Sequence, residues 1–267
     1  MNRPPDGRLG GSVIAVIGAS GGSGTSTLVA ACGTRAASLG RSVVLVDGQA
    51  GGGGLDVVVG IEHVAGLRWP DLLECRGRVD GSELVQRLPG AAGVRVLSHG
   101  RDDAPLPPLT TMTEVLAGLI DAVDLVILDV PRGWASGVVT RGGAAVVASG
   151  VDRWQPSAFL AIDLAVLVSG CGVTELAALT ATTEVVARRV SGCHIVLRGP
   201  ARGLSLKADI ERALDVPVIA QVRDDPSVSR DLSRGRPPGS RRGPVAEVAD
   251  RMLALSGMDV GAAGMVS

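Results

Sequence analysis

The chain has 267 residues, enough for one large α/β domain or two small ones with a sizeable core. Lys207 is the single lysine among 26 basic residues, and tyrosine is absent, a skew typical of a GC-rich genome. Any mechanism that needs a tyrosine acid, or a lysine at another position, is therefore excluded. The net charge of −1 provides no global field to attract nucleic acid or an anionic membrane.

The sequence indicates a protein of the reducing cytosol. Its four cysteines have no C-x-x-C spacing, which argues against a zinc site or a disulfide framework. The first apolar run, 13–17, is too short for a secretory signal. The longest apolar run, 158–169, contains Asp163 and is shorter than the roughly 20 residues of a membrane helix. We therefore expect a cytoplasmic protein.

Short β-branched runs alternate along the chain with longer helical stretches. Strands are expected at 13–17, 43–46, 94–97, 125–128, 164–168, 194–197 and 218–221. Helices are expected at 25–39, 110–122, 174–190, 206–214 and near 245–255. Apolar strands separated by helices predict a parallel sheet covered on both faces. The expected fold class is α/β, a doubly wound and mostly parallel sheet with helices on both faces.

The ends of the chain and two internal stretches interrupt this alternation. Residues 1–11 are expected to be a disordered tail or linker, residues 12–256 the folded domain and residues 257–267 a flexible C-terminal tail. The glycine run 51–54 indicates a loop or a close backbone approach. The stretch 131–156 lacks periodicity, and we expect it to be mobile or to face a partner.

A glycine-rich loop, GASGGSGTST at 18–27, follows the first strand and opens the first helix. In that context consecutive backbone N–H groups and the positive helix end can surround a phosphate, provided that no side chain blocks the approach. A tight turn without a ligand is the simpler alternative. The loop is therefore the first candidate for a binding site.

One resemblance of this loop is to the short-chain dehydrogenases. Residues 17–24 are similar to their dinucleotide fingerprint, and Asp47 ends the second strand where those enzymes hold the ribose hydroxyls. Their chemistry needs a tyrosine assisted by a lysine, and this chain has no tyrosine. NAD(P) binding without that chemistry stays open as a remote alternative.

The second resemblance is to the deviant P-loop of the MinD and ParA ATPases, K-G-G-x-G-K-[ST]-[ST]. Ser20 replaces the signature lysine that reaches across the dimer, and Thr25 replaces the lysine that bridges the β- and γ-phosphates. The turn RGPARG at 198–203 occupies the place of the base-contacting loop of those ATPases, and a glycine–proline turn without a ligand is the equal alternative. The implied ligand is ATP or ADP, and the implied nucleotide-binding residues are Gly21, Gly22, Ser23, Gly24, Thr25, Ser26, Thr27, Arg198 and Pro200.

Acidic residues end two strands that resemble strands of the same ATPases. The resemblance implies a Mg²⁺ site made of Ser26, Asp47 and Asp129, although a loop cap is the plain alternative for Asp129. Gln49 replaces an aspartate that often positions the attacking water, and an amide cannot take a proton as a carboxylate can. Gln49 and Arg132, a cation on the switch-like loop, are the catalytic candidates.

The motifs DGQAGGGGLDVVVG (47–60), GLRWPDL (66–72) and GRVDG (77–81) narrow the resemblance. They resemble the actinobacterial CpaE-like branch of the MinD/ParA superfamily, which is related to TadZ pilus-localisation proteins and septum-site-determining proteins. The resemblance runs from about Ser12 to Leu255. Those relatives usually carry an N-terminal receiver-like domain, so we expect either a truncated chain or a short member.

The resemblance implies a homodimeric nucleotide-binding regulator, recruited to a pole or septum, that positions pilus-assembly, secretion or division machinery through protein partners. Without the two lysines and the aspartate we expect weak or absent ATP hydrolysis. A pseudo-ATPase scaffold without nucleotide function is the alternative. Residues 257–267 lack the basic apolar face with which MinD grips membranes, so no direct membrane insertion is expected.

Five arginines lie within one stretch rich in proline and glycine. They are Arg230, Arg234, Arg236, Arg241 and Arg242. Such a cluster could neutralise DNA phosphates non-specifically, but an exposed loop enriched in arginine is the favoured interpretation. The three histidines show no metal-ligand spacing.

Overall fold

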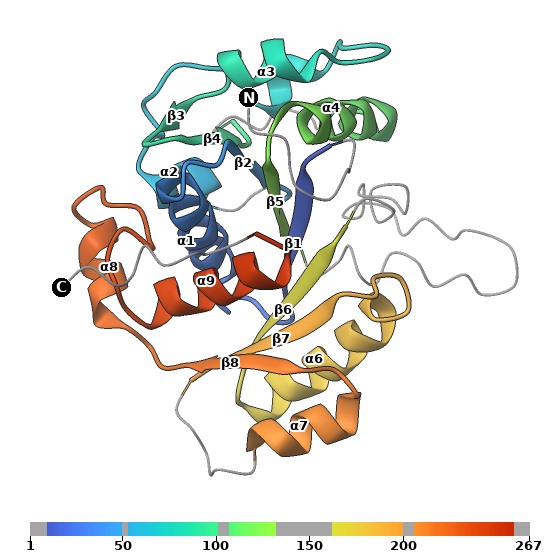
Figure 1. Cartoon of the computed structure of the whole chain (residues 1–267), viewed down its shortest axis with the longest axis vertical. Helices are drawn as coiled ribbons and strands as arrows, with labels where there is room; N and C mark the ends of the chain where they lie inside the picture. The colour runs from blue at the N-terminus through green and yellow to red at the C-terminus, as the bar shows by residue number, and fades with distance from the viewer. Residues whose placement is uncertain (1–9, 50–52, 101–106, 132–161, 200–205, 259–267) are drawn as a thin grey trace, which may run out of the picture.

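The computed structural model describes residues 10–49, 53–100, 107–131, 162–199 and 206–258 (Figure 1). The strands are β1 (Ser12–Gly18), β2 (Val43–Asp47), β3 (Gly90–Ala91), β4 (Val94–Leu97), β5 (Leu125–Val130), β6 (Leu164–Gly170), β7 (Cys193–Arg198) and β8 (Val218–Val222). The helices are α1 (Thr25–Ser38), α2 (Leu55–Val59), the 3-10 helix η1 (Trp69–Leu72), α3 (Gly81–Arg87), α4 (Leu109–Ala122), α6 (Val173–Val186), α7 (Leu206–Leu214), α8 (Pro226–Leu232) and α9 (Pro244–Leu255).

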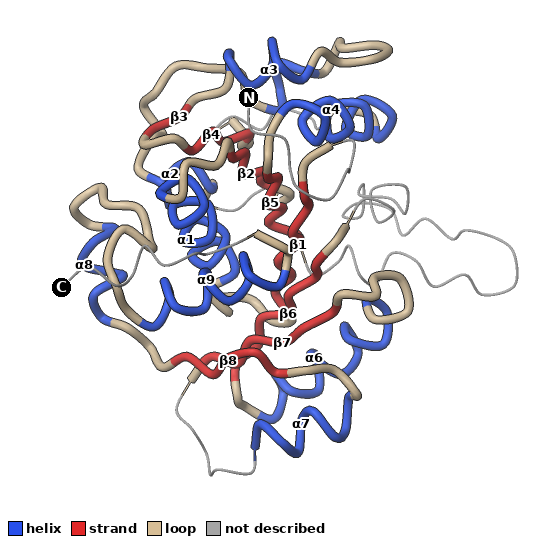
Figure 2. The backbone as a smooth tube through the Cα atoms, viewed as in Figure 1, coloured by secondary structure: helices blue, strands red, loops and turns tan. Residues whose placement is uncertain are grey.

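The described strands form one eight-stranded sheet in the order β3-β4-β2-β5-β1-β6-β7-β8. Neighbouring strands are parallel except β3 and β4, which are antiparallel. Figure 2 shows the strands as a twisted band through the centre with helices around it. The predicted α/β fold class, a mostly parallel sheet with helices on both faces, is confirmed.

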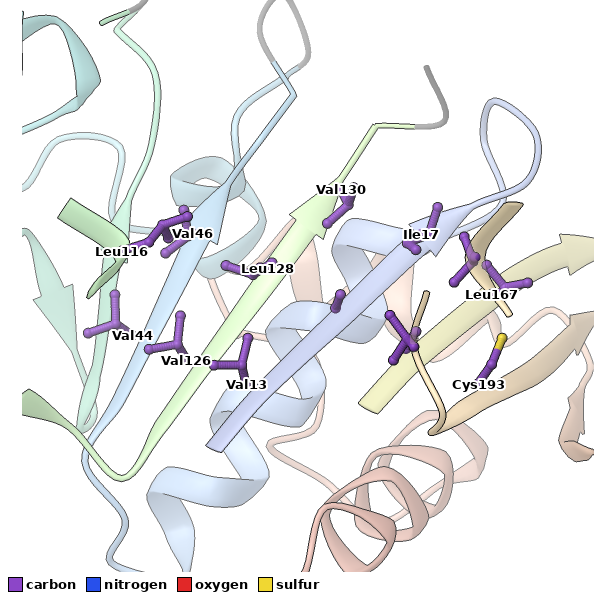
Figure 3. Packing of buried hydrophobic residues seen from close by; sticks show 14 of the residues in the cluster. Val13, Ile17, Val44, Val46, Leu116, Val126, Leu128, Val130, Leu167 and Cys193 are labelled. Atoms are coloured by element: carbon purple, nitrogen blue, oxygen red, sulfur yellow. The ribbon is translucent and has the colours of Figure 1, made fainter. Parts of the chain in front are cut away.

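Alternate residues of β1 enter two different cores. Val13 and Ile17 pack with residues of α3, α4, α6 and α7, whereas Ile14 and Val16 pack with residues of α1, α2 and α9. Figure 3 shows the first core, with Val13 and Ile17 on the same face of the sheet as Val126 of β5. Both faces are covered, which explains why the strand is apolar at successive positions.

Every strand and helix expected from the sequence is present, and the structure adds β3, α2, η1, α3 and α8. The added elements are short, so their hydrophobic periodicity is weak. Capping signals precede two of them: the Asp80 carboxylate accepts two backbone amides at the start of α3, and Asp225 precedes Pro226 at the start of α8. The expectation that helix 174–190 reaches residue 190 was wrong, because α6 ends at Val186.

The strand order decides which strand ends meet. In the dinucleotide-binding order 3-2-1-4-5-6 the second strand lies beside the first. Here β5 lies between β1 and β2, and the register pairs Asp47 with Asp129. The carboxyl ends of β1, β2 and β5 therefore lie at one edge of the sheet, where a doubly wound fold binds its ligands (Figure 3).

Packing reaches slightly beyond residues 12–256. The backbone N–H of Gly11 donates to the carbonyl of Ile120 at 2.7 Å, and Met258 is buried in the core beside α9. The tails beyond these two positions stay predictions. None of the helices in the described part of the chain combines the length and apolar character that crossing a bilayer requires.

Candidate functional site: a glycine loop between two cavities

The glycine loop adopts backbone conformations that only glycine takes without strain. Gly22 has a φ of 72° and Gly24 a φ of 91°, and α1 begins directly after Gly24. A Cβ added at Gly21 or Gly22 would meet nothing within 4 Å, so these positions face open space. The first turn of α1 has no side-chain cap, which leaves its N-terminal amides directed at that space.

A cavity of about 410 Å³ lies over this loop. Its lining residues are Gly18, Ser20, Gly21, Gly22, Ser23, Gly24, Thr25, Ser26, Thr27, Asp47, Gln49, Gly53, Gly54, Leu55 and Arg198. The sequence pointed separately to the loop, to Asp47 and Gln49 at the end of β2, and to Arg198. In the structure all of them line this one cavity. A nest of glycine amides at a helix N-terminus fits a phosphate group.

Residues with hydroxyl side chains stand at the two positions where the deviant P-loop has lysines. The Ser23 and Thr25 hydroxyl oxygens lie 2.8 Å apart, and both side chains are buried. A Cβ added at Gly18 would lie 2.7 Å from Oγ1 of Thr25, so this hydroxyl points back to the end of β1. Ser20 Oγ is buried without a hydrogen-bond partner among the described residues. Neither lysine position therefore supplies a cation.

Asp129 and Ser26 lie in contact at the carboxyl end of β5. The Ser26 hydroxyl hydrogen-bonds to the Asp129 carboxylate, and Gln49 Nε2 donates to Asp129 Oδ1 at 3.3 Å. Burial raises the pKa of Asp129 from 3.8 to about 6. A hydroxyl beside a carboxylate is the oxygen donor set that Mg²⁺ prefers, so these two residues fit the predicted metal site.

Asp47 lines the cavity and also accepts two backbone hydrogen bonds. Its Oδ1 accepts the backbone N–H of Gln49 at 2.9 Å, and its Oδ2 accepts that of Leu55, in the first turn of α2, at 2.8 Å. Burial raises the pKa of Asp47 to about 6, although these two hydrogen bonds oppose the shift. Because both oxygens already accept amides, Asp47 holds the loop between β2 and α2.

A second cavity, of about 390 Å³, adjoins the first and is more apolar. Leu28, Val168, Val196, Val222 and Leu232 contribute apolar side chains to it. The residues that line both cavities are Ser23, Gly24, Thr27 and Arg198. The pair of cavities offers a polar space for phosphates beside an apolar space for a flat ring.

Trp69 contacts the end of β2 beside the site, and the sequence assigned it no role. Trp69 is fully buried, and its Nε1 donates to the backbone carbonyl of Asp47 at 2.9 Å. The ring of His99 also hydrogen-bonds to the Asp47 backbone, and burial lowers its pKa, which favours the neutral ring. The signal in the sequence was the tryptophan inside the motif GLRWPDL, a residue type that is rare in this chain.

Some predicted features lie elsewhere or outside the described residues. Pro200 and Arg132 are outside them, as is the stretch 132–156. Lys207 lies on α7 and pairs with Glu211 at 3.9 Å, as expected for a lysine without a role in the site. The five clustered arginines lie on α8 and the connection to α9; all are exposed, and Arg236 pairs with Asp231 at 3.6 Å.

Similarity to solved structures defines the class of fold. This chain matches a chain of the MinC:MinD cell division protein complex of Aquifex aeolicus over 91% of its own length and 96% of the other, with a TM-score of 0.64 and 19% identity. A ParA family ATPase of Chlorobium tepidum matches over 93% and 97% with a TM-score of 0.64 and 16% identity. The septum site-determining protein MinD of Pyrococcus horikoshii, solved with Mg-ADP, matches over 92% and 97% with a TM-score of 0.63 and 19% identity. The chain therefore has the α/β fold of the MinD and ParA P-loop ATPases.

Two curated proteins of Mycobacterium tuberculosis are more similar in sequence. They are the uncharacterized protein Rv3660c of strain H37Rv and the uncharacterized protein MT3760 of strain CDC 1551, each 34% identical over 248 residues. The alignment covers 92% of this chain but 64% of either relative, so the chain spans less than two thirds of their length. No protein-family profile matches the chain.

Proposed function

We propose that this protein is a regulator that binds Mg²⁺ with ATP or ADP and hydrolyses ATP slowly or not at all. The observation that carries the proposal is the cavity over the glycine loop, in which helix-end amides meet Ser26, whose hydroxyl hydrogen-bonds to the buried carboxylate of Asp129. The adjoining apolar cavity provides room for the base. The Mg-ADP held by MinD of Pyrococcus horikoshii, which shares the fold, supports the same ligand class.

The proposed slow hydrolysis rests on what replaces the usual catalytic groups. Thr25 and Ser20 stand at the two lysine positions, and the Thr25 hydroxyl is directed at Ser23 rather than into the cavity. Gln49 uses one of its two side-chain N–H groups to bind Asp129, and its amide has no carboxylate oxygen that could take a proton from water. A Mg²⁺ ion held by Ser26 and Asp129, with Asp47 also lining the cavity, would neutralise charge on the phosphates.

We further propose that the protein acts as a homodimer in the CpaE/TadZ-like branch of this superfamily and positions pilus, secretion or septum machinery through partner proteins. The motifs at 47–60, 66–72 and 77–81 support this branch, and the MinC:MinD complex supports a role through partners. Binding of non-specific DNA by the five exposed arginines is the less favoured partner interaction.

A scaffold without nucleotide function is the second candidate. The observation that favours it is that acidic and hydroxyl groups of the site already have partners within the protein. Ser26 hydrogen-bonds to Asp129, and both carboxylate oxygens of Asp47 accept backbone amides. These side chains therefore have hydrogen-bond partners without any ligand. NAD(P) binding is disfavoured by the strand order. Here β5 lies between β1 and β2, whereas in the dinucleotide-binding fold the first two strands are neighbours.

Titration calorimetry with ATP, ADP and NAD, each with and without Mg²⁺, tests these candidates, with phosphate release measured in parallel. We expect ATP and ADP to bind more tightly with Mg²⁺, and phosphate release to stay near the rate of the buffer control. Binding of no nucleotide would favour the scaffold. Binding of NAD alone, or fast ATP turnover, would contradict the proposal.

A further inference from the structure

The wall between the two cavities contains a cation. Of the four described residues that line both cavities, Arg198 alone is charged. It is also the single basic residue among the described residues that line the loop cavity, and the only lysine of the chain pairs with Glu211 on α7. Phosphates over the glycine loop therefore meet one described positive side chain, because the other basic residue of the site, Arg223, lines the apolar cavity alone.

The position of this wall decides which part of a nucleotide meets Arg198. A nucleotide with its base in the apolar cavity and its terminal phosphates over the glycine loop must pass the shared wall with its ribose and its first phosphate. We propose that Arg198 binds the α-phosphate and replaces, from the end of β7, the charge that lysines supply in ordinary P-loops. This assignment rests on the proposed nucleotide-binding function.

The guanidinium of Arg198 contacts the loop through Nη1, while its Nε pairs with Asp224 at the wall of the apolar cavity. Nη1 donates to the carbonyl of Gly22 at 2.6 Å, and a Cβ added at Gly24 would lie 3.4 Å from the same nitrogen. The sequence predicted a contact between Arg198 and the base. The contacts with Gly22 and Gly24 favour a phosphate contact instead.

Arg198 also has donors left for an anion. Its Nε pairs with Asp224 Oδ1 at 2.7 Å, so the described residues use two of the five N–H donors of the guanidinium. The Arg198 and Asp224 side chains are 42% and 72% exposed, which makes this ion pair weak in water. A phosphate that carries more charge than Asp224 can compete for the same guanidinium while the Gly22 contact keeps the loop in place.

The test compares adenosine, AMP, ADP and ATP, each with Mg²⁺, as ligands of the full chain by titration calorimetry. We expect Arg198→Gln to weaken the binding of AMP, ADP and ATP by about tenfold, and by similar factors, while adenosine binding does not change. Arg198→Lys keeps the charge without the planar fork, so an intermediate loss is expected. Asp224→Asn releases the guanidinium, and ADP should bind equally or several-fold more tightly.

Arg212→Gln is the matched control, because Arg212 forms a similar exposed ion pair with Asp209 on α7, outside both cavities. It should leave all four affinities within about twofold, and the urea midpoints of all variants should stay near that of the wild type. An equal loss for adenosine would indicate a base contact and overturn the assignment, as would a loss confined to ADP and ATP. Unchanged binding by Arg198→Gln and Arg198→Lys would overturn it while the proposed function stands. A wild-type chain that binds no nucleotide would contradict the proposed function itself.

Discussion

The indole N–H of Trp69 donates a hydrogen bond to the backbone carbonyl of Asp47 at 2.9 Å. The two residues are 22 positions apart, and the bond joins η1 to the last residue of β2. The backbone N–H of Trp69 also donates to the carbonyl of Ser98, after β4. Trp69 therefore holds together two strand ends beside the predicted metal site.

Trp69→Phe should lower the free energy of unfolding by about 1–3 kcal/mol, because it removes this hydrogen bond and leaves a void in a closed core. Urea unfolding followed by circular dichroism measures the loss. Val57→Ala, at a side chain that is 43% exposed, should change stability by less than about 0.5 kcal/mol. If the two variants were equally stable, Trp69 would have no anchoring role.

Asp129→Asn should stabilise the protein at neutral pH and weaken Mg²⁺-dependent nucleotide binding. The folded protein raises the pKa of Asp129 from 3.8 to about 6, so its carboxyl favours folding below pH 3.8 and loses that contribution as the pH rises through 6. Removal of the charge should therefore raise the free energy of unfolding by about 1–3 kcal/mol at pH 7.5 and change it little near pH 4.

Thermal unfolding at both pH values, with and without Mg-ADP, checks this prediction. Asp121→Asn is the control, because the Asp121 carboxylate is 61% exposed and pairs loosely with Arg78 at 3.7 Å. The Asp121→Asn variant should not be more stable than the wild type at pH 7.5. A loss of stability for Asp129→Asn at pH 7.5 would show that its hydrogen bonds with Ser26 and Gln49 outweigh the cost of burial.

Gly24→Val should abolish nucleotide binding, because the side chain fills the loop beside Arg198. Gly40→Val is a matched control: both glycines have a positive φ, 91° at Gly24 and 76° at Gly40, but a Cβ at Gly40 meets nothing within 4 Å. Both variants should lose about 1–3 kcal/mol of stability through backbone strain. Calorimetry with Mg-ADP should then separate them, and equal affinities would contradict a binding role for the loop.

Thr25→Lys should strengthen ATP binding by about tenfold, the value of one charge-assisted hydrogen bond, with a smaller gain for ADP. A lysine is too long for the space beside Ser23 and would extend over the loop toward the phosphates. Ser38→Lys adds the same charge at the exposed end of α1, about 20 Å away, and should change neither affinity. Equal gains from both variants would indicate a general effect of charge. ATP turnover should remain slow, because Gln49 cannot accept a proton.

Much of the fold could be predicted from the sequence, because its strands and long helices carry local signals. Each predicted strand is a short, largely apolar run, and the α/β alternation alone predicts a covered parallel sheet. The short elements α2, α3 and α8 carry few periodic residues, and of these three α3 and α8 begin at a side-chain cap. The end of α6 was predicted four residues too late, because good helix formers and Val190 follow Val186 without a glycine or proline.

The sequence by itself determined the chemistry available to the site: a glycine loop after β1, acidic residues at two strand ends, and no lysine but Lys207. Tertiary structure alone decided which of these groups meet. The insertion of β5 between β1 and β2 aligns Asp129 with Asp47, and the order of β6, β7 and β8 brings Arg198 to Gly22 across 176 positions. Such contacts depend on strand order and packing over long separations, which local periodicity does not encode.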